Sequence, residues 1–277
     1  MKVAMKVAYH GPGFFGFQRQ STLRTVQGDL EKALTRFFRE PVELAAAGRT
    51  DAGVHGLGQV VGFSTETERP LEGMVRALNG RLQGAYVREA ARLKDDDPFH
   101  PRFDALSRTY HYRILGRCRQ GEHIHWSGNY WCLADRLDQE TLLESCRTFL
   151  GEHDFSTFSS RSVHPNPVRR LLNLSVTPAA SPLQNTDAWL FEVRGNAFLR
   201  KMVRLQVAAI VEAGLGRRTP ADLQEMLQAR NPARAPHPAP AEGLYFHSVT
   251  YQNDPFQSER AVEIYRPTAP LGYRFKR

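Results

Sequence analysis

The sequence predicts an α+β protein made of two related units, and three observations carry this prediction. Each half of the chain runs in the order strand, helix, strands, helix, strand. An acidic connector at residues 95–98 separates the halves, so we expect domains at residues 1–104 and 105–277. At 277 residues, the chain is long enough for two domains with their own cores.

The first half begins with a strand, because Val3, Met5 and Val7 alternate with Lys2, Ala4 and Lys6. A helix is expected at residues 25–38, with Thr25 as its N-cap. Its apolar residues recur at helical spacing and share one face: Val26, Leu30, Leu34, Phe37 and Phe38. Three further segments complete this half: a strand at 59–65, a helix at 71–82 and a strand at 85–93.

The second half opens with a strand at residues 104–115, rich in aromatic and β-branched residues. Alternation puts Arg108, Tyr110 and Tyr112 on one side of it. The later segments are a helix at 137–151, a strand pair at 170–178 and 188–195, helices at 197–216 and 219–232, and a strand at 243–252. Thr219 caps the last helix and Pro220 occupies its first turn.

The chain is basic, with a formal net charge of +8 and a pI near 9.6. Such a surplus favours a polyanionic partner, nucleic acid first and an anionic membrane second. Net charge bears on association and not on fold, so a merely basic enzyme stays open as an alternative.

Targeting and redox signals point to the cytoplasm. The first eleven residues lack the unbroken apolar core of a signal peptide, and no stretch approaches the roughly 18 apolar residues of a membrane span. The three cysteines, Cys118, Cys132 and Cys146, are odd in number and too far apart for a CxxC site. We therefore expect a protein without a membrane segment in a reducing compartment.

One carboxylate, Asp51, stands in the glycine-rich segment "GRTDAGVHGLGQV". Three roles are open to it. It can form a turn beside Gly53, or join His55 at a metal, although a loop does not place such a pair reliably. It can also act as an ionised nucleophile or base, with Arg49 two residues away favouring its charged form.

The segment at residues 197–216 carries basic residues beside an apolar face. Helical spacing predicts that Arg200, Lys201 and Arg204 lie near one face. A basic helix face is usually solvated or holds phosphate, yet Arg204 sits among apolar neighbours. A partly buried arginine needs a carboxylate, and Asp51 is an eligible partner.

Several segments together resemble one known family in order and spacing. They are "YHGPGFFGFQRQ", "TVQGDLEKAL", "GRTDAGVHGLGQV", "FHPRFDALSRTYHY", "GEHDFSTFSS", "GNAFLRKMVR" and "AEGLYF". The chain resembles the bacterial tRNA pseudouridine synthase A family from about residue 3 to residue 251. The C-terminal segment at residues 256–277 is not part of this resemblance.

The resemblance implies an isomerase that converts uridine to pseudouridine at positions 38, 39 and 40 of the tRNA anticodon stem-loop. It implies an α+β fold of two similar domains, whose antiparallel sheets, flanked by helices, meet across a central basic cleft. It also implies a homodimer that needs no metal and no organic cofactor. The family's essential aspartate falls on Asp51, its tyrosine on Tyr110 and its arginine on Arg204.

We expect RNA contacts from basic residues around this centre. Arg49 is placed to fill the gap left by a flipped nucleotide, and Tyr110 to stack on the freed base. The candidate phosphate contacts share only a positive charge: Arg161, Arg169, Arg170, Arg200 and Lys201. Without the resemblance, Tyr110 reads as a core aromatic, and each of these basic residues as a solvated surface residue.

Three rival functions differ in what the sequence should show. An RNA-binding homologue without activity would lack the acid, but Asp51 is present. A hydrolase with an aspartyl nucleophile would show a DxD pattern after an apolar strand, which "AAAGRTDAG" does not. A synthase of the same class that acts on another tRNA site or another RNA stays open.

Overall fold

The computed structural model describes residues 1–119, 121, 123–160, 165–257 and 261–263. The helices are α1 (Val26–Phe38), α2 (Leu71–Asn79), α3 (His123–Trp126), α4 (Gln139–Arg147), α5 (Met202–Gly214) and α6 (Pro220–Ala229). The strands are β1 (Lys2–Tyr9), β2 (Ala45–Ala46), β3 (His55–Ser64), β4 (Ala85–Leu93), β5 (Ala105–Gly116), β6 (Trp131–Cys132), β7 (Gly151–Asp154), β8 (Val168–Ala179), β9 (Asp187–Gly195), β10 (Leu244–Tyr251) and β11 (Ala261–Glu263). The predicted α+β class is confirmed.

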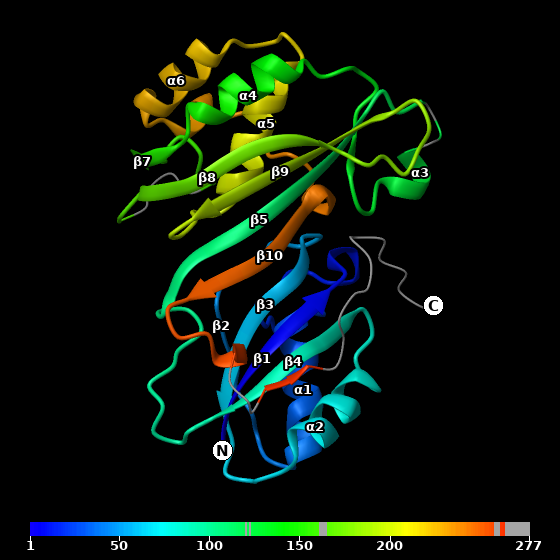
Figure 1. Cartoon of the computed structure of the whole chain (residues 1–277), viewed down its shortest axis with the longest axis vertical. Coiled ribbons are helices and arrows are strands. Elements are labelled where there is room, and N and C mark those ends of the chain that lie inside the picture. The colour runs from blue at the N-terminus through cyan, green and yellow to red at the C-terminus, as the bar shows by residue number, and fades with distance from the viewer. Residues whose placement is uncertain (120, 122, 161–164, 258–260, 264–277) are drawn as a thin grey trace.

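These strands form one mostly antiparallel sheet that runs the length of the molecule (Figure 1). Its main order is β11-β4-β1-β3-β10-β5-β9-β8-β7. The resemblance implied a separate sheet in each domain, and here the two are joined edge to edge. The junction is made by β10, which pairs antiparallel with β5 and, over two residue pairs, parallel with β3.

Two large apolar cores lie against this sheet, and the described residues also include a small third cluster of Leu115, Cys118 and Ala188. One packs α1 and α2 on β1, β3 and β4, and the other packs α4, α5 and α6 on β5, β8, β9 and β10. Leu30 and Leu34 of α1 are completely buried, each stabilising the fold by about 2 kcal/mol. The second core also takes in Ala47, Val54 and Val60 from the first half of the chain. The domain boundary after residue 104 stays a prediction.

The helix signals of the sequence are largely confirmed. Thr25 caps α1 by accepting a hydrogen bond from the Gly28 amide, and Thr219 forms a capping box with Asp222 at the start of α6. Along the described part of the chain, no helix is both long and apolar enough to cross a membrane.

The start of α5 corrects one prediction. The helix begins at Met202, because Lys201 has a left-handed backbone with φ of 62°. Arg200 and Lys201 therefore precede the helix and do not share a face with Arg204. The helix is also buried almost all round, with Arg204 and Glu212 as its two charged residues, so it has no basic face.

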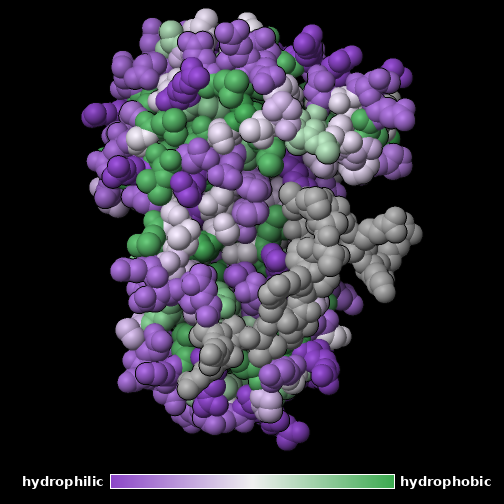
Figure 2. Space-filling view, in the orientation of Figure 1, coloured by the Kyte–Doolittle hydropathy of each residue, from purple (hydrophilic) through white to green (hydrophobic). Residues whose placement is uncertain are grey.

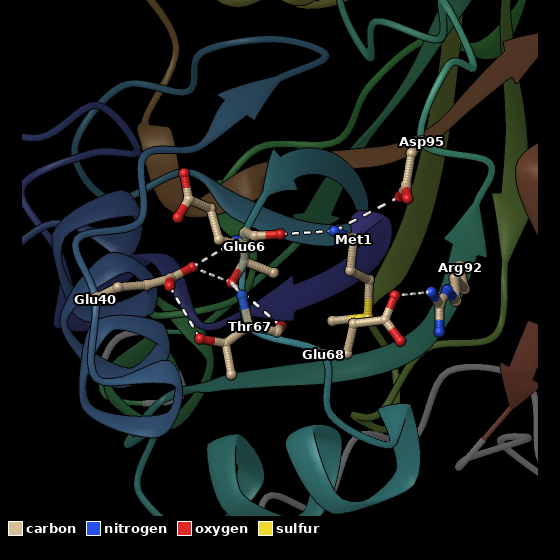
Figure 3. A network of polar contacts seen from close by, with 8 residues as sticks. Met1, Glu40, Glu66, Thr67, Glu68, Arg92 and Asp95 are labelled. Atoms are coloured by element: carbon tan, nitrogen blue, oxygen red, sulfur yellow. Dashed lines mark hydrogen bonds and ion pairs between the residues drawn. The ribbon is translucent and has the colours of Figure 1, made fainter.

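Polar contacts hold the connections around the N-terminus (Figure 3). The Met1 amino group donates to the Thr65 carbonyl at 2.6 Å and lies 3.5 Å from a carboxylate oxygen of Asp95. The Glu40 carboxylate accepts hydrogen bonds from the hydroxyls of Thr65 and Thr67. These bonds lower the pKa of Glu40. The connection after β3 is thus tied to the end of α1.

The surface has a polar margin and an apolar region. In the view of Figure 2, hydrophilic residues dominate the rim, and hydrophobic residues gather in the upper, C-terminal half. Exposed apolar side chains of that half include Val168 and Leu172 of β8.

Candidate active site

Asp51 lies in the loop at residues 47–54, which joins β2 to β3. The loop turns tightly, because the Val54 amide donates to the Asp51 carbonyl at 3.2 Å and Gly53 adopts a φ of 82°. Glycine takes this left-handed backbone without steric cost. The main chain of Asp51 thus closes a turn, as expected if Asp51 forms a turn beside Gly53. Its side chain makes a separate contact, with Arg204.

The segment before α1 packs its backbone directly on this loop. A β-carbon at Gly11 would overlap the Gly53 carbonyl oxygen. Gly16 has a φ of 92°, and a β-carbon there would lie 2.9 Å from the Thr50 carbonyl oxygen. That oxygen accepts a hydrogen bond from the Phe17 amide at 3.0 Å. Glycine in "GPGFFG" therefore lets two backbones approach closely.

Side chains of β1 and β3 hold the Asp51 loop by hydrogen bonds. The Tyr9 hydroxyl and the Thr50 hydroxyl are hydrogen-bonded at 2.9 Å, and burial raises the pKa of Tyr9, which keeps it a neutral phenol. The Gln59 amide donates to the Gly48 carbonyl at 2.9 Å. Both bonds hold residues within three positions of Asp51.

Arg204 of α5 is the ion-pair partner of Asp51. Its Nη1 lies 3.4 Å from Asp51 Oδ2, and its Nε donates to the Ala239 carbonyl at 2.6 Å. The Arg204 side chain is 13% exposed and that of Asp51 30% exposed, so water screens the pair only in part. Asp51 Oδ1 has no hydrogen bond within the described residues and is open to another group. This geometry fits an ionised carboxylate with one oxygen anchored and one available.

Tyr110 lies on β5, close enough for the Asp51 charge to act on it. Its ring makes edge contacts with Phe198 and Phe246, at centroid distances of 5.0 and 5.1 Å. Burial is the main cause of a raised pKa for Tyr110, and the negative charge of Asp51 adds to it. The residue is 8% exposed and belongs to the second core, as the core-aromatic alternative expects. Its role toward a base stays a prediction.

His55 is engaged with the protein through both ring nitrogens. Nδ1 accepts a hydrogen bond from the Gly11 amide at 3.3 Å, and Nε2 lies 3.1 Å from the Glu242 carbonyl oxygen. The neutral ring with hydrogen on Nε2 satisfies both contacts. Burial, with help from the nearby His10, lowers the pKa of His55 to about 3. These contacts leave neither nitrogen directed at a metal shared with Asp51.

The basic residues expected to contact RNA differ in their exposure to solvent. Arg49, Arg170 and Arg200 are exposed, while Lys201 is half-buried. Half-buried Arg169 donates from Nη1 to the carbonyl oxygens of Asn166 and Val168, at 2.8 and 2.6 Å. Arg161 lies outside the described residues. Arg49 makes no ion pair with Asp51 within the described chain. No contact in the structure therefore supports the expectation that Arg49 helps to keep Asp51 charged. The basic cleft stays a prediction.

The comparisons place the chain among enzymes of one family. The tRNA pseudouridine synthase family profile matches residues 5–104 and 145–252. A protein of Thermotoga strain RQ2 named tRNA pseudouridine synthase A is 38% identical over 252 residues, which is 90% of this chain and 99% of that protein. Proteins of the same name from Thermosipho africanus and Aliivibrio fischeri are 40% and 37% identical, over 90% and 99% of this chain and 99% and 98% of their own lengths.

This chain belongs to the tRNA pseudouridine synthase family and is an enzyme, an isomerase. The family and the isomerase activity expected from its motifs are thereby confirmed. Sequence reasoning named Asp51, Tyr110 and Arg204 but missed Tyr9, whose buried hydroxyl contacts the loop.

Proposed function

We propose that this chain isomerises uridine at positions 38, 39 and 40 of the tRNA anticodon stem-loop, with Asp51 as the reacting carboxylate. Isomerisation of uridine in tRNA is the reaction of the family. The observation that supports the catalytic assignment is the Asp51–Arg204 pair, which anchors one carboxylate oxygen at 3.4 Å and leaves the other open.

The reaction conserves atoms and electrons. The bond from ribose C1′ to uracil N1 breaks, and a bond from C1′ to C5 forms. C5 loses its hydrogen to solvent and N1 gains one. Asp51 can attack C1′ as a nucleophile or take a proton to give a glycal, and both routes need the ionised carboxylate. Arg204 stabilises that charge in either case.

Tyr110 is proposed to hold the base while it turns. An aromatic ring stacks on any base for about 1–3 kcal/mol, whichever edge is presented. The raised pKa of Tyr110 keeps its phenol neutral, which supports stacking over proton removal from C5. The edge contacts with Phe198 and Phe246 support the ring from the protein side.

The substrate reaches Asp51 as a flipped nucleotide in this proposal. Flipping costs a few kcal/mol, and exposed Arg49, two residues from Asp51, is placed to compensate for the vacated stack. Phosphate contacts by exposed Arg170 and Arg200 are proposed to supply affinity. Lys201, Arg169 and Arg161 remain proposed contacts of the same kind.

A homodimer and a cytoplasmic location complete the proposal. Exposed Val168 and Leu172 on β8 support an apolar contact between copies. The cysteines Cys118, Cys132 and Cys146 form no disulfide, which supports a reducing compartment. Light scattering across a range of protein concentrations distinguishes monomer from dimer.

The experiment that tests the proposed substrate maps pseudouridine in an unmodified tRNA transcript with uridine at positions 38, 39 and 40. Carbodiimide adducts that stop primer extension are expected at these three positions. A transcript with cytidine at all three serves as the control. Stops at other uridines would favour a different tRNA site. No stops in any tRNA or other RNA would favour a binding protein without activity.

A further inference from the structure

Arg108 of β5 uses its whole guanidinium to bind main-chain oxygens. The group has five N–H donors, and the structure gives it five hydrogen bonds. Nε and Nη2 donate to the Ala47 carbonyl oxygen at 3.2 and 3.1 Å. Nη1 donates to the carbonyl oxygens of Ala105 and Asn196 at 3.1 and 2.8 Å, and Nη2 donates to that of Arg102 at 2.5 Å. Carbonyl oxygens, and no carboxylate of the described chain, thus accept every bond.

Two of the segments that Arg108 binds are continuous in sequence with Asp51 and Arg204. Ala47 opens the loop that carries Asp51 four residues later. Asn196 directly follows β9 and begins the connection to α5, where Arg204 lies. Arg108 itself precedes Tyr110 by two residues on β5, so both side chains project from the same side of the strand. One side chain therefore links the supports of all three groups.

The other hydrogen bonds of the Asp51 loop come mainly from the first half of the chain. Tyr9, Phe17 and Gln59 hold residues 48 and 50 from that side. Arg108 joins the start of the loop to the second half, which carries Tyr110 and Arg204. A displacement of about 1 Å between reacting groups can cost about 100-fold in rate. The 3.4 Å separation of Asp51 and Arg204 depends on the relative position of the halves.

We propose that Arg108 is a positioning residue, which sets the distance of Asp51 from Arg204 and Tyr110 through its two bonds to Ala47. The proposal rests on the proposed function. Burial lowers the pKa of Arg108, yet its five bonds keep the charged group satisfied. Lysine cannot replace it, because an ammonium group has three donors and no planar fork.

The test compares Arg108→Lys and Arg108→Ala with wild type under single-turnover conditions. Release of tritium from tRNA labelled at uridine C5 measures the rate constant, and titration of the enzyme gives the half-saturating concentration. We expect a loss of about 100-fold in rate for Arg108→Lys and more for Arg108→Ala. The half-saturating concentration is expected to change by less than about threefold, because Arg108 faces main-chain oxygens and not RNA.

Arg194→Lys is the matched control. Arg194 is an exposed arginine on the neighbouring strand β9, paired in register with Thr109. Its replacement is expected to leave the rate constant unchanged. All variants are compared well below their unfolding midpoints, since a scaffold role alone lowers the midpoint and not the rate of the folded enzyme.

A second readout measures the positioning directly. The coupling between Asp51→Asn and Arg204→Gln, obtained from urea unfolding, is determined in wild-type and Arg108→Lys backgrounds. We expect the coupling factor to fall at least threefold in the Arg108→Lys background. Wild-type enzyme that forms no pseudouridine would refute the proposed function. Active wild type with an unchanged Arg108→Lys rate and coupling would refute the role of Arg108.

Discussion

Replacing Arg204 by glutamine removes the positive partner of Asp51 and keeps a side chain of similar length. At 3.4 Å, two unit charges attract by about 1 kcal/mol in bulk water and about 5 kcal/mol at an effective dielectric constant near 20. Both side chains are partly exposed, which puts the interaction between these limits, at about 2–3 kcal/mol. If the transition state uses this stabilisation fully, turnover falls about 30- to 150-fold.

Tritium release from tRNA labelled at uridine C5 measures this loss. Arg204→Lys is expected to lose less, because it keeps the charge but cannot bind both Asp51 and the Ala239 carbonyl with one fork. Glu212→Gln is the control, since Glu212 lies on the same helix as Arg204 and its ion pair is with Arg218, which lies between α5 and α6. Folded Arg204→Gln with turnover within threefold of wild type would refute the role assigned to the pair.

Two further predictions concern the setting of the loop. Gly11→Ala should lower the unfolding midpoint and the activity, because its β-carbon would overlap the Gly53 carbonyl oxygen. The control is Gly13→Ala, whose β-carbon meets no atom within 4 Å and which should match wild type. Thermal unfolding compares the two variants, and equal midpoints would contradict the packing of Gly11 on the loop. His55 has a pKa of about 3 in the folded protein against about 6.5 in the unfolded chain, so the unfolded chain binds more protons between these pH values. The contribution of His55 to the free energy of unfolding is therefore full above pH 6.5 and declines as the pH falls toward 3. The loss attributable to His55 is up to about 5 kcal/mol; urea unfolding from pH 7 to pH 4 should show a shallower decline for His55→Gln, and parallel curves would contradict the buried neutral ring.

The local elements could be predicted because their signals are local. Thr25 as N-cap and the four-residue spacing of Leu30 and Leu34, about one helical turn, define α1 without tertiary information. The pairing of Asp51 with Arg204, 153 residues apart, followed from a general rule, that an arginine among apolar neighbours needs a carboxylate. Chemical necessity therefore predicted a long-range contact that periodicity could not.

The missed features have no comparable signal. The left-handed backbone of Lys201 is unusual for a non-glycine residue, so nothing in the pattern predicts that α5 begins at Met202, five residues after the expected start at residue 197. The position of β10 between β3 and β5 depends on the topology of the whole chain. The partners of Arg108 are carbonyl oxygens, which every residue has, so no pattern of side chains points to them.

The most direct test of the central claim is the rate of pseudouridine formation by Asp51→Asn, together with its affinity for tRNA. Asparagine keeps the size of the side chain and removes its charge, so the account predicts loss of product to below detection. The dissociation constant for tRNA should stay within about threefold of wild type, because phosphate contacts supply most of the affinity. A folded Asp51→Asn enzyme that forms pseudouridine within tenfold of the wild-type rate would contradict the account.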